Sequence, residues 1–88
     1  MKIMIIYRPA SDHSQTVEEY VREFSFRNPE LGVDLLSIET REGANAAELY
    51  GIMSYPAMMV IKDDGQIAND WQGTPLPLMN EVAYYALG

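Results

Sequence analysis

The sequence predicts an α/β fold in three layers, with the order β-α-β-α-β-β-α and a four-stranded mixed sheet covered by helices on both faces. Three observations predict it. Continuous apolar runs at 3–7 and 57–61 are typical of strands buried on both faces. Apolar residues recur with helical spacing between these runs. An Asp64-Gly65 pair follows the second run as a hairpin signal. With 88 residues and no repeat or linker, we expect a single domain, 1–88.

The first half of the chain should form a strand, a helix and a second strand. After the strand of residues 3–7, a helix should begin between Ser11 and Ser14, because serine and aspartate side chains accept hydrogen bonds from the free amides of a first turn. Asp12 and Gln15 have the spacing of a capping box. Asn28-Pro29 should end this helix, and a short strand should follow at 33–38. The apolar stripe of the helix comprises Val17, Tyr20, Val21 and Phe24.

The second half should form a short helix, a hairpin and a last helix. Asn45 and Glu48 form a second capping-box pair, opening a helix that stops near Gly51. Strands at 57–61 and 67–71 should pair antiparallel across the Asp64-Gly65 turn. Thr74-Pro75 should cap the last helix, with Pro75 and Pro77 both in its first turn. The apolar stripe of that helix comprises Leu78, Val82 and Tyr85.

The composition excludes several kinds of chemistry. The absence of cysteine rules out disulfides, thiolate metal sites and cysteine nucleophiles. A single histidine, His13, leaves too few ligands for a zinc site, so we expect neither metal nor cofactor. A net charge of −7 disfavours nucleic acid and membrane surfaces as partners. No apolar stretch approaches the ~20 residues that cross a bilayer. We therefore expect a cytoplasmic protein.

Residues 49–65 carry the most specific pattern in the chain. A short helix ends in Tyr50-Gly51-Ile52, Pro56 precedes an apolar strand, and a hairpin centred on Gly65 follows. Gly73 then ends the last strand. In these features and in its element order, the chain resembles the thioredoxin superfamily. The family's usual first strand and helix have no counterpart here, and in that minimal form the chain is closer in architecture to glutaredoxins.

The resemblance implies where a redox site would lie. The family's Cys-x-x-Cys motif opens the first helix, where the helix amides lower the thiol pKa. The matching segment here is Ser11-Asp12-His13-Ser14, with serine at both cysteine positions. Many family members also carry a buried carboxylate in the preceding strand, and the equivalent position here lies close to Ile5. We therefore expect a redox-inactive domain that is not an enzyme of thiol–disulfide exchange.

The same four residues give little indication of other chemistry. They include serine, histidine and aspartate, but adjacent residues at a helix start point in different directions, so they are not expected to converge as a catalytic triad. Helix capping and turn formation is the simpler interpretation of Ser11, Asp12, His13 and Ser14.

A binding role is the leading hypothesis. The resemblance implies that the bond before Pro56 is cis and that Tyr55 lies beside the Ser11–Ser14 helix start. In redox-active relatives the residue at the Tyr55 position offers its backbone to an extended peptide. We expect a peptide- or protein-binding groove built from Tyr7, Tyr55, Pro56 and Gly73, together with Ser11–Ser14.

Two alternatives stay open. One is a binder of a small anion or glutathione-like ligand, or a non-thiol enzyme, using the helix start at Ser11–Ser14. The other is an assembly role, with Met58 and Met59 or Trp71 at a subunit contact. We expect a monomer or a weak homodimer.

Overall fold

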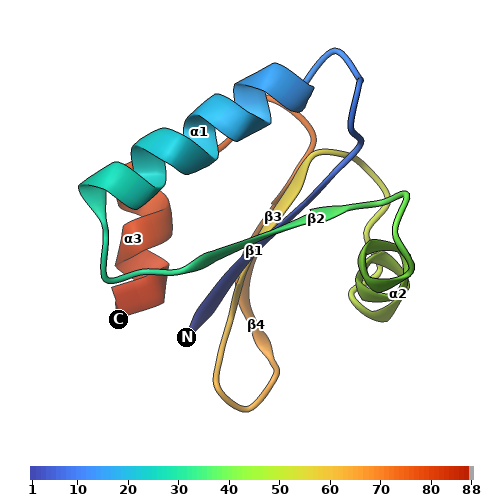
Figure 1. Cartoon of the computed structure of the whole chain (residues 1–88). Coiled ribbons are helices and arrows are strands. Elements are labelled where there is room, and N and C mark those ends of the chain that lie inside the picture. Colours follow the sequence, from blue (N-terminus) through green and yellow to red (C-terminus); the bar gives the residue numbers. More distant parts are fainter. Residues whose placement is uncertain (88) are drawn as a thin grey trace.

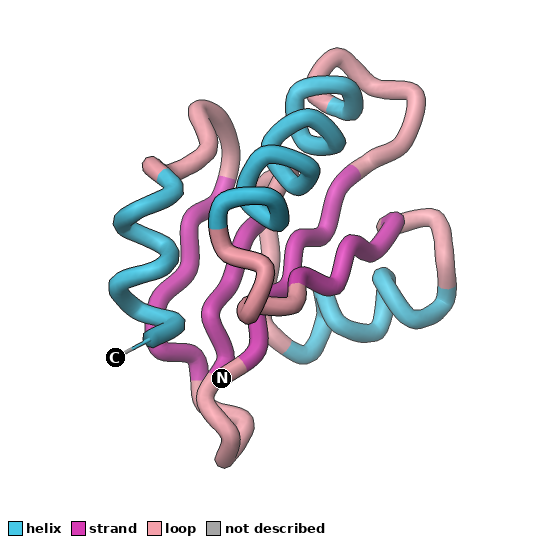
Figure 2. The backbone as a smooth tube through the Cα atoms, turned by 60° about the vertical axis from the view of Figure 1, so that its left-hand side comes forward, coloured by secondary structure: helices cyan, strands magenta, loops and turns pink. Residues whose placement is uncertain are grey.

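The computed structural model describes residues 1–87 and has the predicted three-layer α/β architecture. The element order is β-α-β-α-β-β-α, and the four strands form one mixed sheet in the order β2-β1-β3-β4. Helices α1 and α3 lie on one side of the sheet and α2 lies on the other (Figures 1 and 2). The elements are β1 (Lys2–Tyr7), α1 (Ser14–Arg27), β2 (Val33–Ser37), α2 (Arg41–Leu49), β3 (Ala57–Ile61), β4 (Ile67–Gln72) and α3 (Met79–Leu87).

The strand pairing follows from the connections. A helical crossover joins β1 to β2, and these two strands are parallel, with Ile5 opposite Leu35. The hairpin at Gly65 (φ +91°) makes β3 and β4 antiparallel, and β3 is also antiparallel to β1. The two central strands are therefore β1 and β3, and both are rich in apolar residues because both of their faces are covered.

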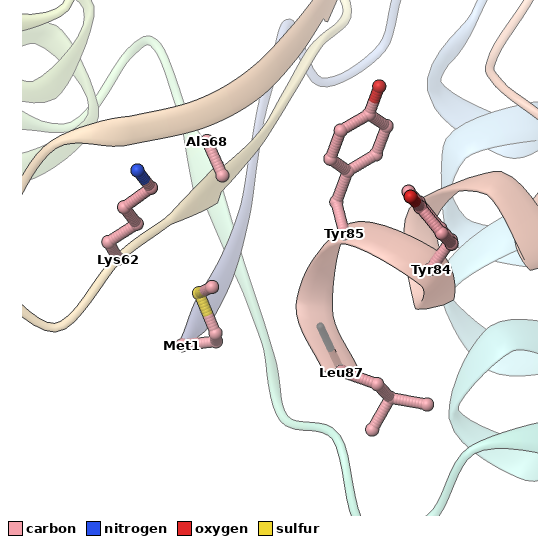
Figure 3. A pocket seen from close by; sticks show the side chains of 6 residues that line it. All are labelled: Met1, Lys62, Ala68, Tyr84, Tyr85 and Leu87. Atoms are coloured by element: carbon pink, nitrogen blue, oxygen red, sulfur yellow. The ribbon is translucent and has the colours of Figure 1, made fainter.

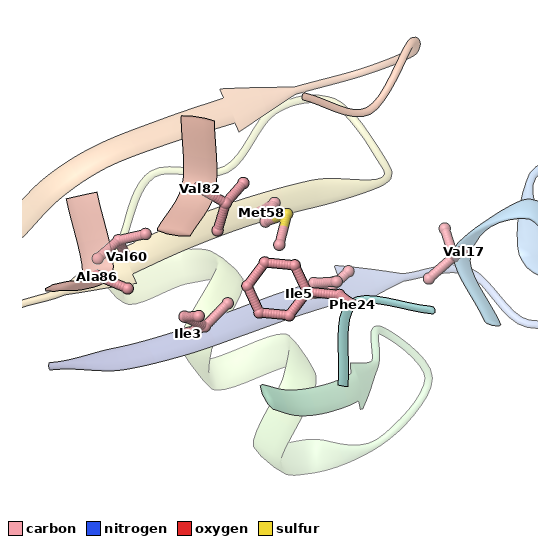
Figure 4. Packing of buried hydrophobic residues seen from close by; sticks show 8 residues of the cluster. All are labelled: Ile3, Ile5, Val17, Phe24, Met58, Val60, Val82 and Ala86. Carbon is pink, nitrogen blue, oxygen red and sulfur yellow. The ribbon is translucent and has the colours of Figure 1, made fainter. Parts of the chain in front are cut away.

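The sheet separates two apolar clusters. Alternate residues of β1 and β3 point to opposite faces, so Ile5 and Met58 pack under α1 and α3 while Ile6 and Met59 pack over α2. In the first cluster, Phe24 from α1 and Val82 from α3 complete the packing (Figure 4). Met58 and Met59 are fully buried, so the expected subunit contact at these two residues is wrong.

Helix α1 begins at the last residue of the predicted range, Ser14, and its N-cap residue His13 makes no side-chain cap hydrogen bond. The predicted Asp12–Gln15 capping box is wrong, because the Gln15 amide side chain donates to Glu19 one turn further along the helix, at 3.1 Å. The end of the helix at Asn28 agrees with the sequence. In the predicted stripe, two residues are fully buried and two are partly buried: Val17 and Phe24, then Tyr20 and Val21.

Helix α2 begins five residues before the predicted start. Its cap is Thr40, whose Oγ1 accepts a hydrogen bond from the Gly43 amide at 3.0 Å, so the prediction of Asn45 as the cap is wrong. Gly43 is a poor helix former, and its presence argued against a helix start there. It is tolerated because α2 runs very close to the end of β2 at this point.

Helix α3 is shorter than predicted, and Thr74-Pro75 does not cap it. The helix begins at Met79, after both prolines, because a residue that precedes proline disfavours helical geometry. Leu78 is 71% exposed and lies outside the buried stripe, whereas Val82 is fully buried and Tyr85 packs against the first cluster. No helix within residues 1–87 is long and apolar enough to cross a membrane.

Candidate functional site

One wall of the candidate site is the loop that joins β1 to α1. The Ser11 hydroxyl donates a hydrogen bond to the Arg8 carbonyl, and the Ser14 amide and hydroxyl both donate to the Ser11 carbonyl, at 3.2 Å and 3.0 Å. The Arg8 amide donates to Nε2 of His13 at 3.2 Å. The side chains of Ser11, His13 and Ser14 therefore form hydrogen bonds with the main chain of the same loop and stabilise its conformation.

These hydrogen bonds do not form a catalytic triad. The Ser11 hydroxyl is directed at a main-chain carbonyl rather than at His13, and within residues 1–87 the Asp12 side chain makes no hydrogen bond. The sequence prediction of turn residues in place of a nucleophile is consistent with this geometry. The loop also contains Ala10 at φ +58°, a left-handed conformation that is uncommon for a residue with a Cβ.

The opposite wall is the segment that leads into β3. The Tyr55–Pro56 peptide bond is cis, as the resemblance implies. The Pro56 carbonyl accepts a hydrogen bond from the Gly73 amide at 2.8 Å, and Gly73 adopts φ +84° at the end of β4, a conformation that residues with a side chain rarely adopt. Gly73 therefore supports Pro56 through its backbone.

Gln72 fixes the approach to Tyr55. Its Oε1 accepts hydrogen bonds from the amides of Met53 and Ser54, at 2.9 Å and 3.3 Å, and its Nε2 donates to Asp70 at 3.0 Å. The segment before Pro56 is thereby tied to the end of β4. Gln72 is absent from the predicted site residues, although its position directly before Gly73 could have pointed to it.

Arg8 connects the two walls. Its guanidinium lies 5.6 Å from the centre of the Tyr55 ring, within range of a cation–π contact. Tyr7 ends β1 and packs against the first cluster, whereas Tyr55 packs against the second. The structure thus brings Tyr55 to Arg8, and Arg8 to His13 and Ser11. Arg8 is also absent from the predicted site residues, although it directly follows Tyr7.

The main chain of Tyr55 has free hydrogen-bonding capacity. Neither its N–H nor its C=O forms a hydrogen bond with any part of residues 1–87. The residue as a whole is partly buried. An unpaired backbone donor and acceptor beside an aromatic surface can accept an extended chain.

The interior behind this site offers no acid–base chemistry. Ile5 is fully buried, and across residues 1–87 no buried side chain is polar or charged. In the same described part of the chain, no three histidine, aspartate or glutamate side chains gather into a possible metal site. Together with the absence of cysteine from the sequence, these features argue against thiol–disulfide oxidoreductase activity.

Surface hollows occur away from this site. One of about 600 Å³ is lined by Tyr84, Tyr85 and Leu87 of α3 and by Met1, Lys62 and Ala68 of the neighbouring sheet segments (Figure 3). Two more lie beside α3, against the α1 residues Tyr20 and Arg27. Tyr55 and Pro56 line none of these three hollows. Tyr55 is partly buried and Pro56 is fully buried, so the expectation that the Pro56 side chain lines an open groove is wrong.

Comparison with known proteins identifies the architecture. No protein-family model matches the chain, and no curated protein matches it by sequence. Solved structures do match. Thioredoxin from Fasciola hepatica superposes with a TM-score of 0.73 at 15% identity, covering 97% of this chain and 76% of that one. Thioredoxin 1 from Thermosipho africanus superposes with a TM-score of 0.69 at 9% identity, and the match covers 97% of this chain and 89% of that one.

A plant thioredoxin agrees with these two. Thioredoxin O2 from Arabidopsis thaliana gives a TM-score of 0.72 at 12% identity, covering 94% of this chain and 69% of that one. Identities this low establish the likeness of fold and nothing about activity. The chain has a thioredoxin-like fold.

Proposed function

We propose that this chain is a redox-inactive thioredoxin-like domain that binds an extended peptide or protein segment beside Pro56. The observation that carries the proposal is the unpaired main chain of Tyr55, whose ring lies against the Arg8 guanidinium. A bound segment would exchange main-chain hydrogen bonds with Tyr55 and lay one side chain on its ring.

The hydrogen bonds that fix the segments on either side of Tyr55 favour a binding role for this surface. Gln72 and Gly73 hold the two sides of the Tyr55–Pro56 segment through three hydrogen bonds, which involve Met53, Ser54 and Pro56. A recognition surface benefits from such preorganisation, since less conformational entropy is lost when a partner binds. Arg8 supplies a cation to this surface, so a carboxylate on the partner would find a counter-charge there.

The test starts from peptides selected by display on the folded domain. Peptides that bind should shift the amide resonance of Tyr55, and their affinity should fall about tenfold or more in Tyr55→Ala, which removes an aromatic contact at the centre of the surface. Tyr84→Ala is the matched control, because Tyr84 is an exposed tyrosine on α3. Equal losses in both variants, or no selectable peptide, would contradict the proposal.

A second candidate is anion binding at the start of α1. This helix has no side-chain cap and no acidic residue in its first turn, and the amides of Gln15 and Thr16 make no hydrogen bond within residues 1–87. Free amides at a helix start favour an anion. Titration with inorganic phosphate or glutathione should then move the resonances of Ser11 to Gln15. Unchanged resonances there would remove this candidate and leave the peptide proposal intact.

A further inference from the structure

The sheet has two edges, formed by β2 and β4 (Figure 2). The two edges differ in the main-chain groups that remain free to form hydrogen bonds. On an edge strand, every second residue presents its N–H and C=O to the open side, and these groups are a template for pairing with another chain. Which residues face outward on each strand follows from the bonds made on its inner side.

The β4 edge is partly blocked. The bond from the Gly73 amide to Pro56 shows that odd-numbered residues at this end of β4 face β3, so Asp70 and Gln72 face outward. The outward amide of Asp70 already donates to Oδ1 of the neighbouring Asn69, at 2.9 Å. The Asn69 side chain thus occupies the Asp70 amide, which is the central outward N–H group of the β4 edge.

The β2 edge is open. The Ile38 amide donates to the Tyr7 carbonyl at 2.9 Å, so even-numbered residues of β2 face β1 and Val33, Leu35 and Ser37 face outward. The Ser37 carbonyl is occupied, because it accepts bonds from the amide and Oγ1 of Thr40, at 3.1 Å and 2.7 Å. The other outward main-chain groups of these three residues have no partner within residues 1–87.

We propose that the β2 edge pairs with the β2 edge of a second copy, antiparallel and centred on Leu35. Such a pair is self-complementary: Leu35 faces Leu35 of the second copy and exchanges two hydrogen bonds with it, while each Ser37 amide donates to the opposite Val33 carbonyl. These four bonds use the Leu35 amide and carbonyl, the Ser37 amide and the Val33 carbonyl of each copy, and they leave the Ser37 carbonyl to Thr40.

Charge on this edge favours a second copy. The strand carries one ionised residue, Asp34, and its carboxylate is paired with Nζ of Lys2 at 3.2 Å. The charges at the β2 edge therefore cancel within each copy, although each chain has a net charge of −7, so this edge can approach a second copy without local repulsion. The partly buried Val33 and Leu35 of each copy would extend the first apolar cluster across the junction.

The association should be weak and should strengthen with salt. Four main-chain hydrogen bonds over five residues make a small interface, so we expect a Kd on the order of 1 mM. Added salt screens the repulsion between two chains of like net charge, which lowers the Kd.

The experiment combines sedimentation with amide hydrogen exchange of the whole chain, at about 0.05 mM and at about 2 mM, on either side of that Kd. At the higher concentration the average mass should rise, and the Leu35 and Ser37 amides should become protected. The Asp34 and Leu36 amides, which face β1, should be protected at both concentrations. A chain that stays monomeric, or a dimer that leaves Leu35 and Ser37 unprotected, would overturn the proposal.

A charge variant tests the same surface without altering its backbone. Asp34→Lys places a second cation beside Lys2 on each copy and should raise the Kd about tenfold or more through repulsion across the pair. Glu18→Lys on the exposed face of α1 changes the net charge equally and should dimerise at least as well as the original chain. Circular dichroism confirms that both variants are folded. Equal dimerisation of the two variants would refute pairing through β2.

Discussion

At the scale of single residues, Gly43 shows how closely two elements approach. A Cβ added to this glycine would lie 1.9 Å from the Ser37 carbonyl oxygen at the end of β2. Backbone is the obstacle, so no side-chain rotation relieves the overlap and α2 would have to move. The position therefore needs glycine for space rather than for a special backbone conformation.

Gly43→Ala should reduce the free energy of unfolding by about 1–3 kcal/mol. Gly32→Ala is the control, since a Cβ there meets no atom within 4 Å and that substitution should be close to neutral. Urea unfolding followed by the fluorescence of Trp71 measures both changes. Similar stabilities for the two variants would show that the close approach of α2 and β2 is absent.

The serines of the candidate site carry the second prediction at this scale. The Ser14 amide donates to the Ser11 carbonyl, an i to i+3 turn that keeps the two Cα atoms within about 7 Å, close to the range that disulfides span. Ser11→Cys combined with Ser14→Cys should form an intramolecular disulfide, detected as a mass loss of two hydrogens that dithiothreitol reverses. Ser11→Cys combined with Ser25→Cys, on the far part of α1, should not form one. Failure of the first pair would show that Ser11 and Ser14 do not match the Cys-x-x-Cys positions.

At the scale of elements, the first two helices differ in how they begin. Helix α2 has a side-chain cap from Thr40, whereas α1 begins without one. In α1 the nearby polar side chains bond to the loop instead, which leaves the first amides of the helix free.

Thr40→Ala should therefore cost about 1 kcal/mol of stability, the typical value of an N-cap hydrogen bond. Asp12→Ala should cost almost nothing, because its carboxylate makes no hydrogen bond to the start of α1. Thermal or urea unfolding of the two variants measures the loss of stability in each. A cost at Asp12 as large as that at Thr40 would contradict the assignment of the two helix starts.

The elements also differ in how well the sequence predicts them. The two central strands are predictable because of their long apolar runs, and the hairpin is predictable because Asp64-Gly65 selects a tight turn. The start of α2 is not predictable, because Gly43 is a poor helix former and the close packing against β2 that requires glycine there is not visible in the sequence. The site is only half predictable: Tyr55 and Pro56 follow from a local pattern, but Arg8 and Gln72 act through contacts between distant segments.

At the scale of the whole molecule, Tyr20 links the helix layer to the segment before α3. Its hydroxyl donates to the Pro77 carbonyl at 2.7 Å, and burial, with a smaller contribution from Glu81, raises the pKa of Tyr20 to about 12 from its usual 10.0. The unfolded chain therefore loses this proton at a lower pH than the folded one. Stability should fall as pH rises from about 10 to about 12.

Tyr20→Phe should be less stable at neutral pH, because the hydrogen bond to Pro77 is lost, but its stability should decline less between pH 10 and pH 12. Tyr84→Phe, at an exposed tyrosine, is the control for the loss of a tyrosine hydroxyl. The free energy of unfolding in urea at a series of alkaline pH values gives the comparison. An equally steep decline in Tyr20→Phe would mean that other groups cause the loss.

The division of the interior by the sheet has a consequence for the candidate site. Tyr7 rests on the apolar cluster under α1 and α3, and Tyr55 rests on the cluster over α2. Tyr7 and Tyr55 thus pack against different apolar clusters, so the distance between them depends on the packing of both clusters. For the proposed peptide-binding function, we therefore expect changes in side-chain volume in either layer to alter the distance between Tyr7 and Tyr55, and so the choice of bound segment, without touching that segment.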